Sequence, residues 1–133
     1  MLGEAVTVCS GAVVFAGSTV GARTVIGDQA FVRENVQIGE DCGVGRGVCI
    51  ENQVSIGSRC SIQSNSYITR LSVLEDDVFI APCVTTTNDN FMGRTEARHE
   101  LLQGATSTVR ELMTEARRGN SVEAERMAPV SYT

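Results

Sequence analysis

The chain has 133 residues, a formal net charge of −5 and 42% hydrophobic residues, enough for one buried core. Only 5% of its residues are aromatic, so that core must consist of small and branched aliphatic side chains. The acidic balance argues against a protein that binds the phosphates of nucleic acid. No apolar stretch reaches the about 20 residues that a membrane-spanning helix needs. The N-terminus has no signal-peptide pattern, so we expect a cytoplasmic protein that binds neither nucleic acid nor membrane.

The five cysteines are odd in number and include no C-x-x-C pair. They therefore predict neither a zinc knuckle nor a disulfide framework, and buried reduced thiols are the simpler interpretation. His99 is the single histidine of the chain. We expect no bound metal.

Residues 1–84 repeat with a period of six. From the eighth residue onward, thirteen consecutive sixth residues are aliphatic, and all seven isoleucines of the chain fall in this phase. The residue four positions later is always small or β-branched, and glycine often follows the aliphatic residue directly. The aliphatic series is Val8, Val14, Val20, Ile26, Val32, Ile38, Val44, Ile50, Ile56, Ile62, Ile68, Leu74 and Ile80.

A period of six fits neither an α-helix nor an uninterrupted strand, but it fits strands broken by regular corners. Six residues make one flat side of roughly 20 Å, and three such sides close a triangular coil of eighteen residues. Stacked coils then form parallel strands about 4.8 Å apart. The sequence therefore predicts an all-β, parallel β-helix of a little over four coils. The glycines after the aliphatic positions (Gly21, Gly27, Gly39, Gly45 and Gly57) are interpreted as corner residues with unusual backbone angles.

In such a coil, residues eighteen apart are neighbours. Arg23, Asp41, Arg59 and Asp77 then form one column of alternating charge, and Arg33 lies under Glu51. Opposite charges on adjacent strands are favourable and like charges are not, so these pairs support the eighteen-residue coil.

The repeat stops after Val84. Residues 85–106 are polar and predict a long loop of the kind that often carries function on a rigid scaffold. Residues 107–133 change character again, with a capping-box pattern at Thr108 and Glu111 and helical spacing over 109–118. We expect a short C-terminal α-helix there that covers the open edge of the last coil.

The segments IGEDCGVGRGVCIENQVSIGSRCSIQSNSYI and LEDDVFIAPCVTTTNDN resemble the hexapeptide-repeat acyltransferases, and are most similar to bacterial nucleotide-sugar N-acetyltransferases. The resemblance covers about residues 5–104. It implies a left-handed β-helix, a homotrimer with active sites between subunits, and acetyl-CoA as the co-substrate. The implied reaction is transfer of acetyl to the amine of a nucleotide-linked amino sugar.

The resemblance also implies roles for single residues. Asn88 matches the asparagine of the family's T-N-D segment and is the first catalytic candidate, and His99 has a suitable pKa for a general base. Thr87, Asp89, Arg94, Asn65 and Glu75 are candidates for substrate binding, with the Arg94 guanidinium suited to a diphosphate. Each also has a structural interpretation: Asn88 and Asp89 often form turns, and loop charges are often only solvated. Tyr67 could line a groove between subunits or serve packing alone.

Three alternatives follow from the same residues. A hexapeptide-repeat carbonic anhydrase needs three zinc-binding histidines, and one histidine excludes it. An acyltransferase for another small amine fits the repeat equally well. Family members resume the repeat after the loop, whereas residues 107–133 do not. A truncated, non-catalytic β-helix scaffold without the late coenzyme-A-binding coils is therefore the third alternative.

Overall fold

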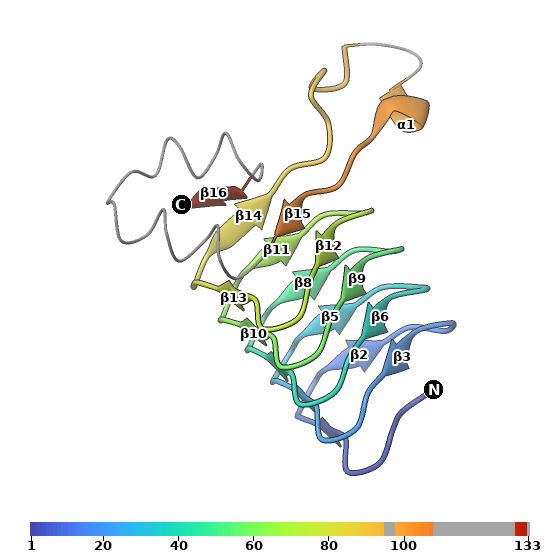
Figure 1. Cartoon of the computed structure of the whole chain (residues 1–133), viewed down its shortest axis with the longest axis vertical. Helices are drawn as coiled ribbons and strands as arrows, with labels where there is room; N and C mark the ends of the chain where they lie inside the picture. Colours follow the sequence, from blue (N-terminus) through green and yellow to red (C-terminus); the bar gives the residue numbers. More distant parts are fainter. Residues whose placement is uncertain (95–97, 108–129, 133) are drawn as a thin grey trace.

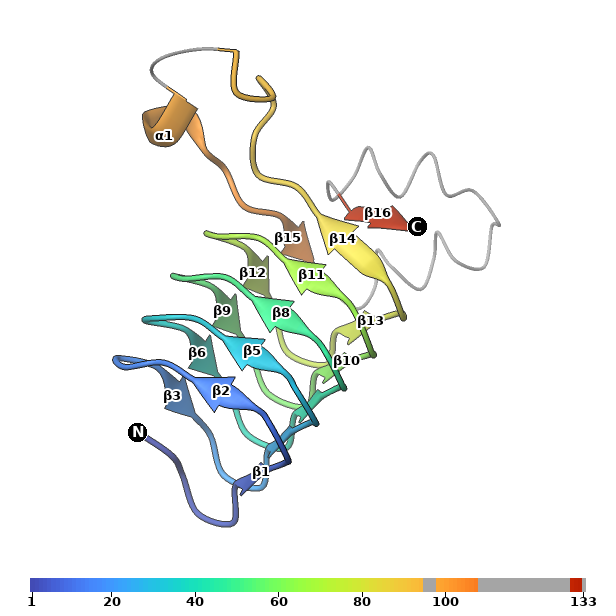
Figure 2. The ribbon, with the colours of Figure 1, turned by 180° about the vertical axis from the view of Figure 1, so that it is seen from behind.

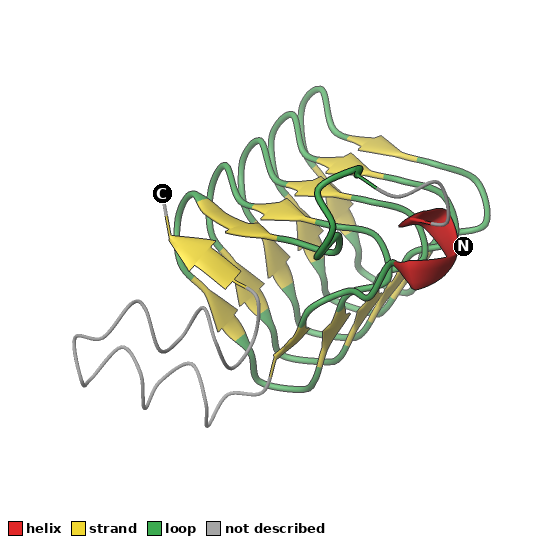
Figure 3. Cartoon of the chain, turned by 90° about the horizontal axis from the view of Figure 1, so that it is seen from above, coloured by secondary structure: helices red, strands yellow, loops and turns green. Residues whose placement is uncertain are grey.

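A computed structural model describes residues 1–94, 98–107 and 130–132 of the chain. The strands coil around one axis and form a prism with three flat faces (Figures 1 and 3). This arrangement confirms the predicted all-β, parallel β-helix. The near-side strands of Figure 2 run from right to left while the chain climbs toward its C-terminus, so the coil is left-handed. Crossovers between parallel strands are normally right-handed, which makes the left hand a specific property of this repeat.

Each face is a separate sheet. The first face consists of β1 (Thr7–Val8), β4 (Val25–Ile26), β7 (Gly43–Val44), β10 (Ser61–Ile62) and β13 (Phe79–Ile80). The second face consists of β2 (Val13–Val14), β5 (Phe31–Val32), β8 (Cys49–Ile50), β11 (Tyr67–Ile68), β14 (Val84–Thr86) and β16 (Val130–Tyr132). The third face consists of β3 (Thr19–Val20), β6 (Gln37–Ile38), β9 (Ser55–Ile56), β12 (Val73–Leu74) and β15 (Thr106–Ser107).

The aliphatic phase of the sequence forms the core. Most strands have two residues, of which the first faces solvent and the second faces the interior. Ile26, Ile50 and Ile68 have no exposed surface at all. The small residues of the second phase, such as Val48 and Ser66, are buried where two faces converge. The exceptions are Val8, which is 43% exposed, and half-buried Val14, because β1 and β2 belong to the first, incompletely covered coil.

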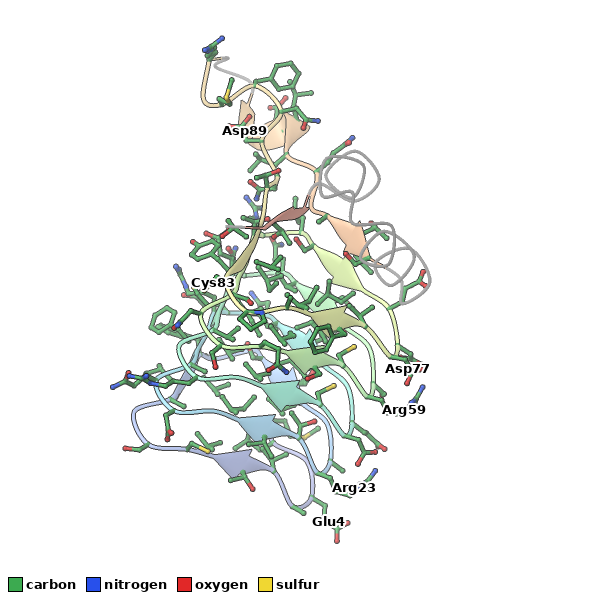
Figure 4. The ribbon with its side chains drawn as sticks, turned by 90° about the vertical axis from the view of Figure 1, so that its left-hand side faces the viewer. Glu4, Arg23, Arg59, Asp77, Cys83 and Asp89 are labelled. Atoms are coloured by element: carbon green, nitrogen blue, oxygen red, sulfur yellow. The ribbon has the colours of Figure 1, made fainter. Side chains whose placement is uncertain are left out.

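Successive coils stack in an eighteen-residue register. Ile38 lies beside Ile56, and Ile56 lies beside Leu74, in parallel strands. The predicted charge column forms as two ion pairs along one edge, Arg23 with Asp41 at 2.7 Å and Arg59 with Asp77 at 2.7 Å (Figure 4). Val32 lies beside Ile50, so Arg33 and Glu51 are neighbours as predicted, but they form no ion pair. The Arg33 guanidinium instead binds its chain neighbour Glu34 at 2.9 Å.

The corners lie at a different position from the one that the glycines suggested. The residue with positive φ recurs every six residues and is usually not glycine, as at Asn35 (58°), Asp41 (55°) and Asn65 (61°). Asparagine and aspartate tolerate this left-handed conformation better than most residues.

The glycines after the aliphatic positions serve close stacking instead. A Cβ built on Gly21 would lie 2.5 Å from the carbonyl carbon of Gly39, and one on Gly39 would lie 2.6 Å from that of Gly57. The corner interpretation of these glycines is therefore wrong: they lack a side chain because the backbone of the next coil occupies its place.

The coil ends in a way that the repeat pattern did not reveal. β14 extends to Thr86, which is buried at the position that an aliphatic residue has in the other repeats. The Thr86 hydroxyl forms a hydrogen bond with the Thr69 hydroxyl at 2.9 Å. After the loop, β15 pairs with β12 and places buried Ser107 beside Leu74, so the prism resumes for one strand. β16 pairs antiparallel with β14. The helix predicted over 109–118 lies outside the described residues.

The loop itself contains one element, the single-turn helix α1 (Arg98–Leu101). Within the ranges that the structure describes, no helix has the length and apolar character needed to span a bilayer.

The stacking interpretation makes a matched prediction for two glycines of neighbouring strands. Gly39→Ala should lower the free energy of unfolding by about 1–3 kcal/mol, because its Cβ meets backbone that cannot move aside. Gly43→Ala should be neutral or slightly stabilising, since nothing lies within 4 Å of its Cβ. Urea denaturation followed by circular dichroism measures both. Equal losses in the two variants would contradict the stacking role.

Candidate active site

The long loop projects from one edge of the prism. Turn residues 16–17, 34–35, 52–53 and 70–71 form this edge, called the 2/3 edge because it joins the second and third faces. The loop leaves after β14 and returns to β15, above the top coil (Figure 1). It is therefore an insertion at one corner of the coil, directly above Arg70.

Asn88 joins the loop to this edge. Its side-chain amide is half-buried, and Nδ2 donates a hydrogen bond to the backbone oxygen of Arg70 at 3.1 Å. Its backbone oxygen accepts from the Gln103 N–H at 3.0 Å, across the base of the loop. Asn88 therefore has a fixed position, while its side-chain oxygen and second amide hydrogen have no partner among the described residues.

Asp89 organises the next turn. Its carboxylate accepts hydrogen bonds from the backbone N–H groups of Phe91 at 2.8 Å and Gly93 at 2.9 Å. The side chain points into the loop that stands above the coils in Figure 4. The backbone N–H of Arg94 donates to the Phe91 oxygen at 3.0 Å, and the Arg94 side chain is exposed. This geometry agrees with the turn-forming interpretation of Asp89.

The remaining predicted residues do not all gather here. Thr87 is exposed and lies directly after β14, next to Asn88. His99 lies in α1, and its side chain is outside the description. Asn65 lies at the edge between the first and second faces, and Glu75 follows β12 toward the edge between the third and first faces. Within one chain, Asn65 and Glu75 are therefore on different edges from Asn88.

A hydrogen-bonded cluster lies below Asn88 on the same edge. The Glu51 carboxylate accepts from the Tyr67 hydroxyl at 2.7 Å and from the Arg70 backbone N–H at 2.7 Å. The Arg70 guanidinium donates from Nε to the side-chain oxygen of Gln53 at 2.8 Å, and among the described residues it has no carboxylate partner. Glu51 and Asn88 thus bind the N–H and the carbonyl of the same residue.

The electrostatics of this cluster are dominated by Glu51. The hydrogen bond to Glu51 raises the pKa of Tyr67 to about 12, so its phenol remains protonated at neutral pH. Burial, followed by the charge of Glu51, raises the pKa of the Cys49 thiol. Arg33 lies nearby, but its guanidinium is bound to Glu34 and holds the pKa of that carboxyl below its usual value.

Glu51 and Arg70 were not predicted as site residues, and the role of Tyr67 was left open between groove and packing. The signal was the stacking register itself, because Arg70 lies eighteen residues before Asn88, and Glu51 bonds residues sixteen and nineteen positions later. Applied to the loop as well as to the repeats, the same register would have placed Arg70 under Asn88.

The arrangement combines an amide with a free donor and acceptor, a carboxylate with two hydrogen bonds, and a cation without a carboxylate partner. An ionised carboxylate has about four acceptor positions, so Glu51 keeps capacity for further bonds. Within the described ranges, no group of three or more His, Cys, Asp and Glu side chains is placed to bind a metal ion. The edge therefore provides polar groups that could bind and orient a polar substrate.

Residues 35–70 match a family model described as bacterial transferase hexapeptide (six repeats). These residues carry the bacterial transferase hexapeptide repeat. The matched range, 35–70, equals two eighteen-residue coils, and it contains Glu51, Tyr67 and Arg70. The matched range thus ends at Arg70, the residue to which the loop is bonded through Asn88. A comparison with curated protein sequences finds no match.

Solved structures of similar fold include PerB from Caulobacter crescentus in complex with CoA and GDP-perosamine. It is 18% identical, with a TM-score of 0.36, and the match covers 66% of this chain and 48% of that one. A histidine-to-asparagine variant of perosamine N-acetyltransferase from the same organism is 19% identical, with a TM-score of 0.26 and the same coverages. The hexapeptide chain therefore spans about half the length of these proteins.

Proposed function

We propose that this protein is an N-acetyltransferase that moves acetyl from acetyl-CoA to the amine of a nucleotide-linked amino sugar. The observation that carries the proposal is the position of Asn88. The T-N-D segment is inserted at an edge of transferase-type hexapeptide coils, and its asparagine is anchored there with hydrogen-bonding capacity left over. The remaining amide hydrogen of Asn88 suits the thioester oxygen, on which negative charge develops during attack by an amine.

The loop and the edge divide the work of such a site. Asp89 holds the turn beside Asn88, and Thr87 and the exposed Arg94 are available to bind the acceptor, with the Arg94 guanidinium suited to its diphosphate. His99, in α1 of the same loop, is a second candidate catalytic residue. Holding two substrates in attack geometry supplies much of the rate in direct transfer reactions, which need no covalent enzyme intermediate.

A homotrimer in the cytoplasm is part of the proposal. The outer surface of the second face has a continuous column of Val13, Phe31, Cys49 and Tyr67 in adjacent strands. Val13, Phe31 and Tyr67 are 42%, 37% and 38% exposed, so the column is an apolar strip that association would bury. Only packing against another copy would bring Asn65 or Glu75, which lie on other edges, to the site of Asn88.

Binding and turnover test the function directly. Isothermal titration with acetyl-CoA and with a UDP-linked amino sugar should give binding of both ligands, and mass spectrometry should detect the acetylated sugar. Product detection avoids thiol reagents, which would also react with exposed Cys83. Sugar binding without coenzyme binding would favour the scaffold alternative, and activity on other small amines alone would favour the second alternative. If the protein binds neither ligand, the transferase function is excluded.

Asn88→Ala should lower kcat/KM by about 10²–10³-fold, because it removes a donor to the developing negative charge. The variant also loses one partly buried hydrogen bond, at a cost of about 1 kcal/mol, so Tm should fall by only a few degrees. The matched control is Asn90→Ala, which changes an exposed asparagine of the same loop. Steady-state kinetics that are the same for Asn88→Ala and the wild type would refute the assignment of Asn88.

Phe31→Glu should convert the trimer to monomers, since it places a charge in the middle of the apolar strip. Phe79→Glu on the first face is the control, because Phe79 is 52% exposed and lies beside Ser61 rather than in an apolar column. Sedimentation velocity measures the assembly, and circular dichroism confirms folding. A trimer that persists in Phe31→Glu and dissociates in Phe79→Glu would show that the first face is the interface.

A further inference from the structure

We infer that Glu51 is the proton acceptor for the attacking amine, an inference that rests on the function proposed above. The sequence pattern indicated Glu51 only as a neighbour of Arg33 and not as a site residue. It is only half-buried, so a substrate can reach it. Its carboxylate and the amide of Asn88 are both bound to the backbone of Arg70, one through the N–H and one through the carbonyl. Glu51 therefore reaches the Arg70 backbone from the coil below and Asn88 reaches it from the loop above, so both side chains lie on the 2/3 edge.

Two hydrogen bonds orient the Glu51 carboxylate. Tyr67 from β11 donates to one carboxylate oxygen at 2.7 Å, and the Arg70 N–H donates to the other at 2.7 Å. The other titratable groups that interact with it are Arg33, after β5, and Cys49, on β8. The Arg33 guanidinium forms an ion pair with Glu34, and Cys49 is a free cysteine. No described guanidinium forms an ion pair with Glu51, which leaves its charge available to accept a proton.

The reaction step balances with these groups. The amine nitrogen of the acceptor attacks the thioester carbonyl carbon, and a new C–N bond forms as the C–S bond breaks. The nitrogen loses one proton to a Glu51 oxygen, and the same proton then passes to the departing thiolate sulfur. The products are the amide and free coenzyme A thiol, and Glu51 returns to its charged form. Positioned acid–base groups of this kind typically contribute about 10²–10⁴-fold to a rate.

A purely structural role predicts a different result, and Glu51→Gln separates the two. Glutamine keeps both hydrogen bonds: its oxygen can accept from the Arg70 N–H, and its NH₂ group can donate to the Tyr67 hydroxyl, which accepts as well as donates. The fold and the binding of both ligands should therefore persist. If Glu51 accepts the proton, kcat should fall by about 10²-fold or more at unchanged Kd, and the acidic limb of the pH–rate profile should disappear.

The experiment measures kcat, KM and pH profiles by mass spectrometry for the wild type, Glu51→Gln and the control Glu40→Gln, an exposed carboxylate on another edge. If Glu51→Gln does not fold, Glu51→Asp decides. It keeps a carboxylate but shortens the side chain, so kcat should fall while the acidic limb of the profile persists.

The inference is overturned if the wild type transfers acetyl and Glu51→Gln keeps a normal kcat and the acidic limb of the profile. The transferase function would then still stand. A normal kcat in Glu51→Asp would overturn it in the same way. A wild type that transfers no acyl group to any amine would overturn both.

Discussion

The close stacking of successive coils is the constraint on which the rest of this structure depends. The backbone N–H of Thr19 bonds the oxygen of Val36, and the same seventeen-residue offset recurs through the prism. Coils at this spacing leave no room for a side chain where Gly21, Gly39 and Gly57 follow one another. Below the inserted loop, the backbone hydrogen-bond partners of a residue thus follow from its distance along the chain. A side chain on an edge meets the residues about eighteen positions before and after it, and few others.

The same constraint explains how a protein with very short strands can hold a site. The strands are only two or three residues long, so the precision must come from the register of whole coils. An insertion at one corner leaves that register intact below it, and β15 resumes the third face with Ser107 beside Leu74. The loop is therefore free to carry polar residues, while its base is tied to the coil through Asn88, Arg70 and Gln103.

Most of the fold could be predicted from the sequence, because the aliphatic period reports the interior directly: Ile50, Ile56 and Ile62 are buried as expected. Pairings between exposed side chains could not. Arg33 has two neighbouring carboxylates, Glu51 in the next coil and Glu34 beside it in the chain. Its guanidinium forms the ion pair with Glu34. The burial of Thr86 and Ser107 could not be predicted either, because these polar residues occupy interior positions. Their burial follows from the backbone register rather than from side-chain chemistry. The handedness came from resemblance, since a period of six fits either hand.

Comparison of two edges of the prism shows what is unusual about Glu51. On the edge between the third and first faces, Asp41 and Asp77 each bind an arginine of the preceding coil, so the charges compensate each other. The 2/3 edge has both kinds of charge as well, yet Glu51 binds a phenol and a backbone N–H, and the Arg70 guanidinium binds the neutral Gln53. Among the described residues, neither the Glu51 carboxylate nor the Arg70 guanidinium forms an ion pair, although both lie on this edge. A carboxylate, a guanidinium and the anchored Asn88 amide on one edge are what a site needs to bind a charged substrate and to take its proton.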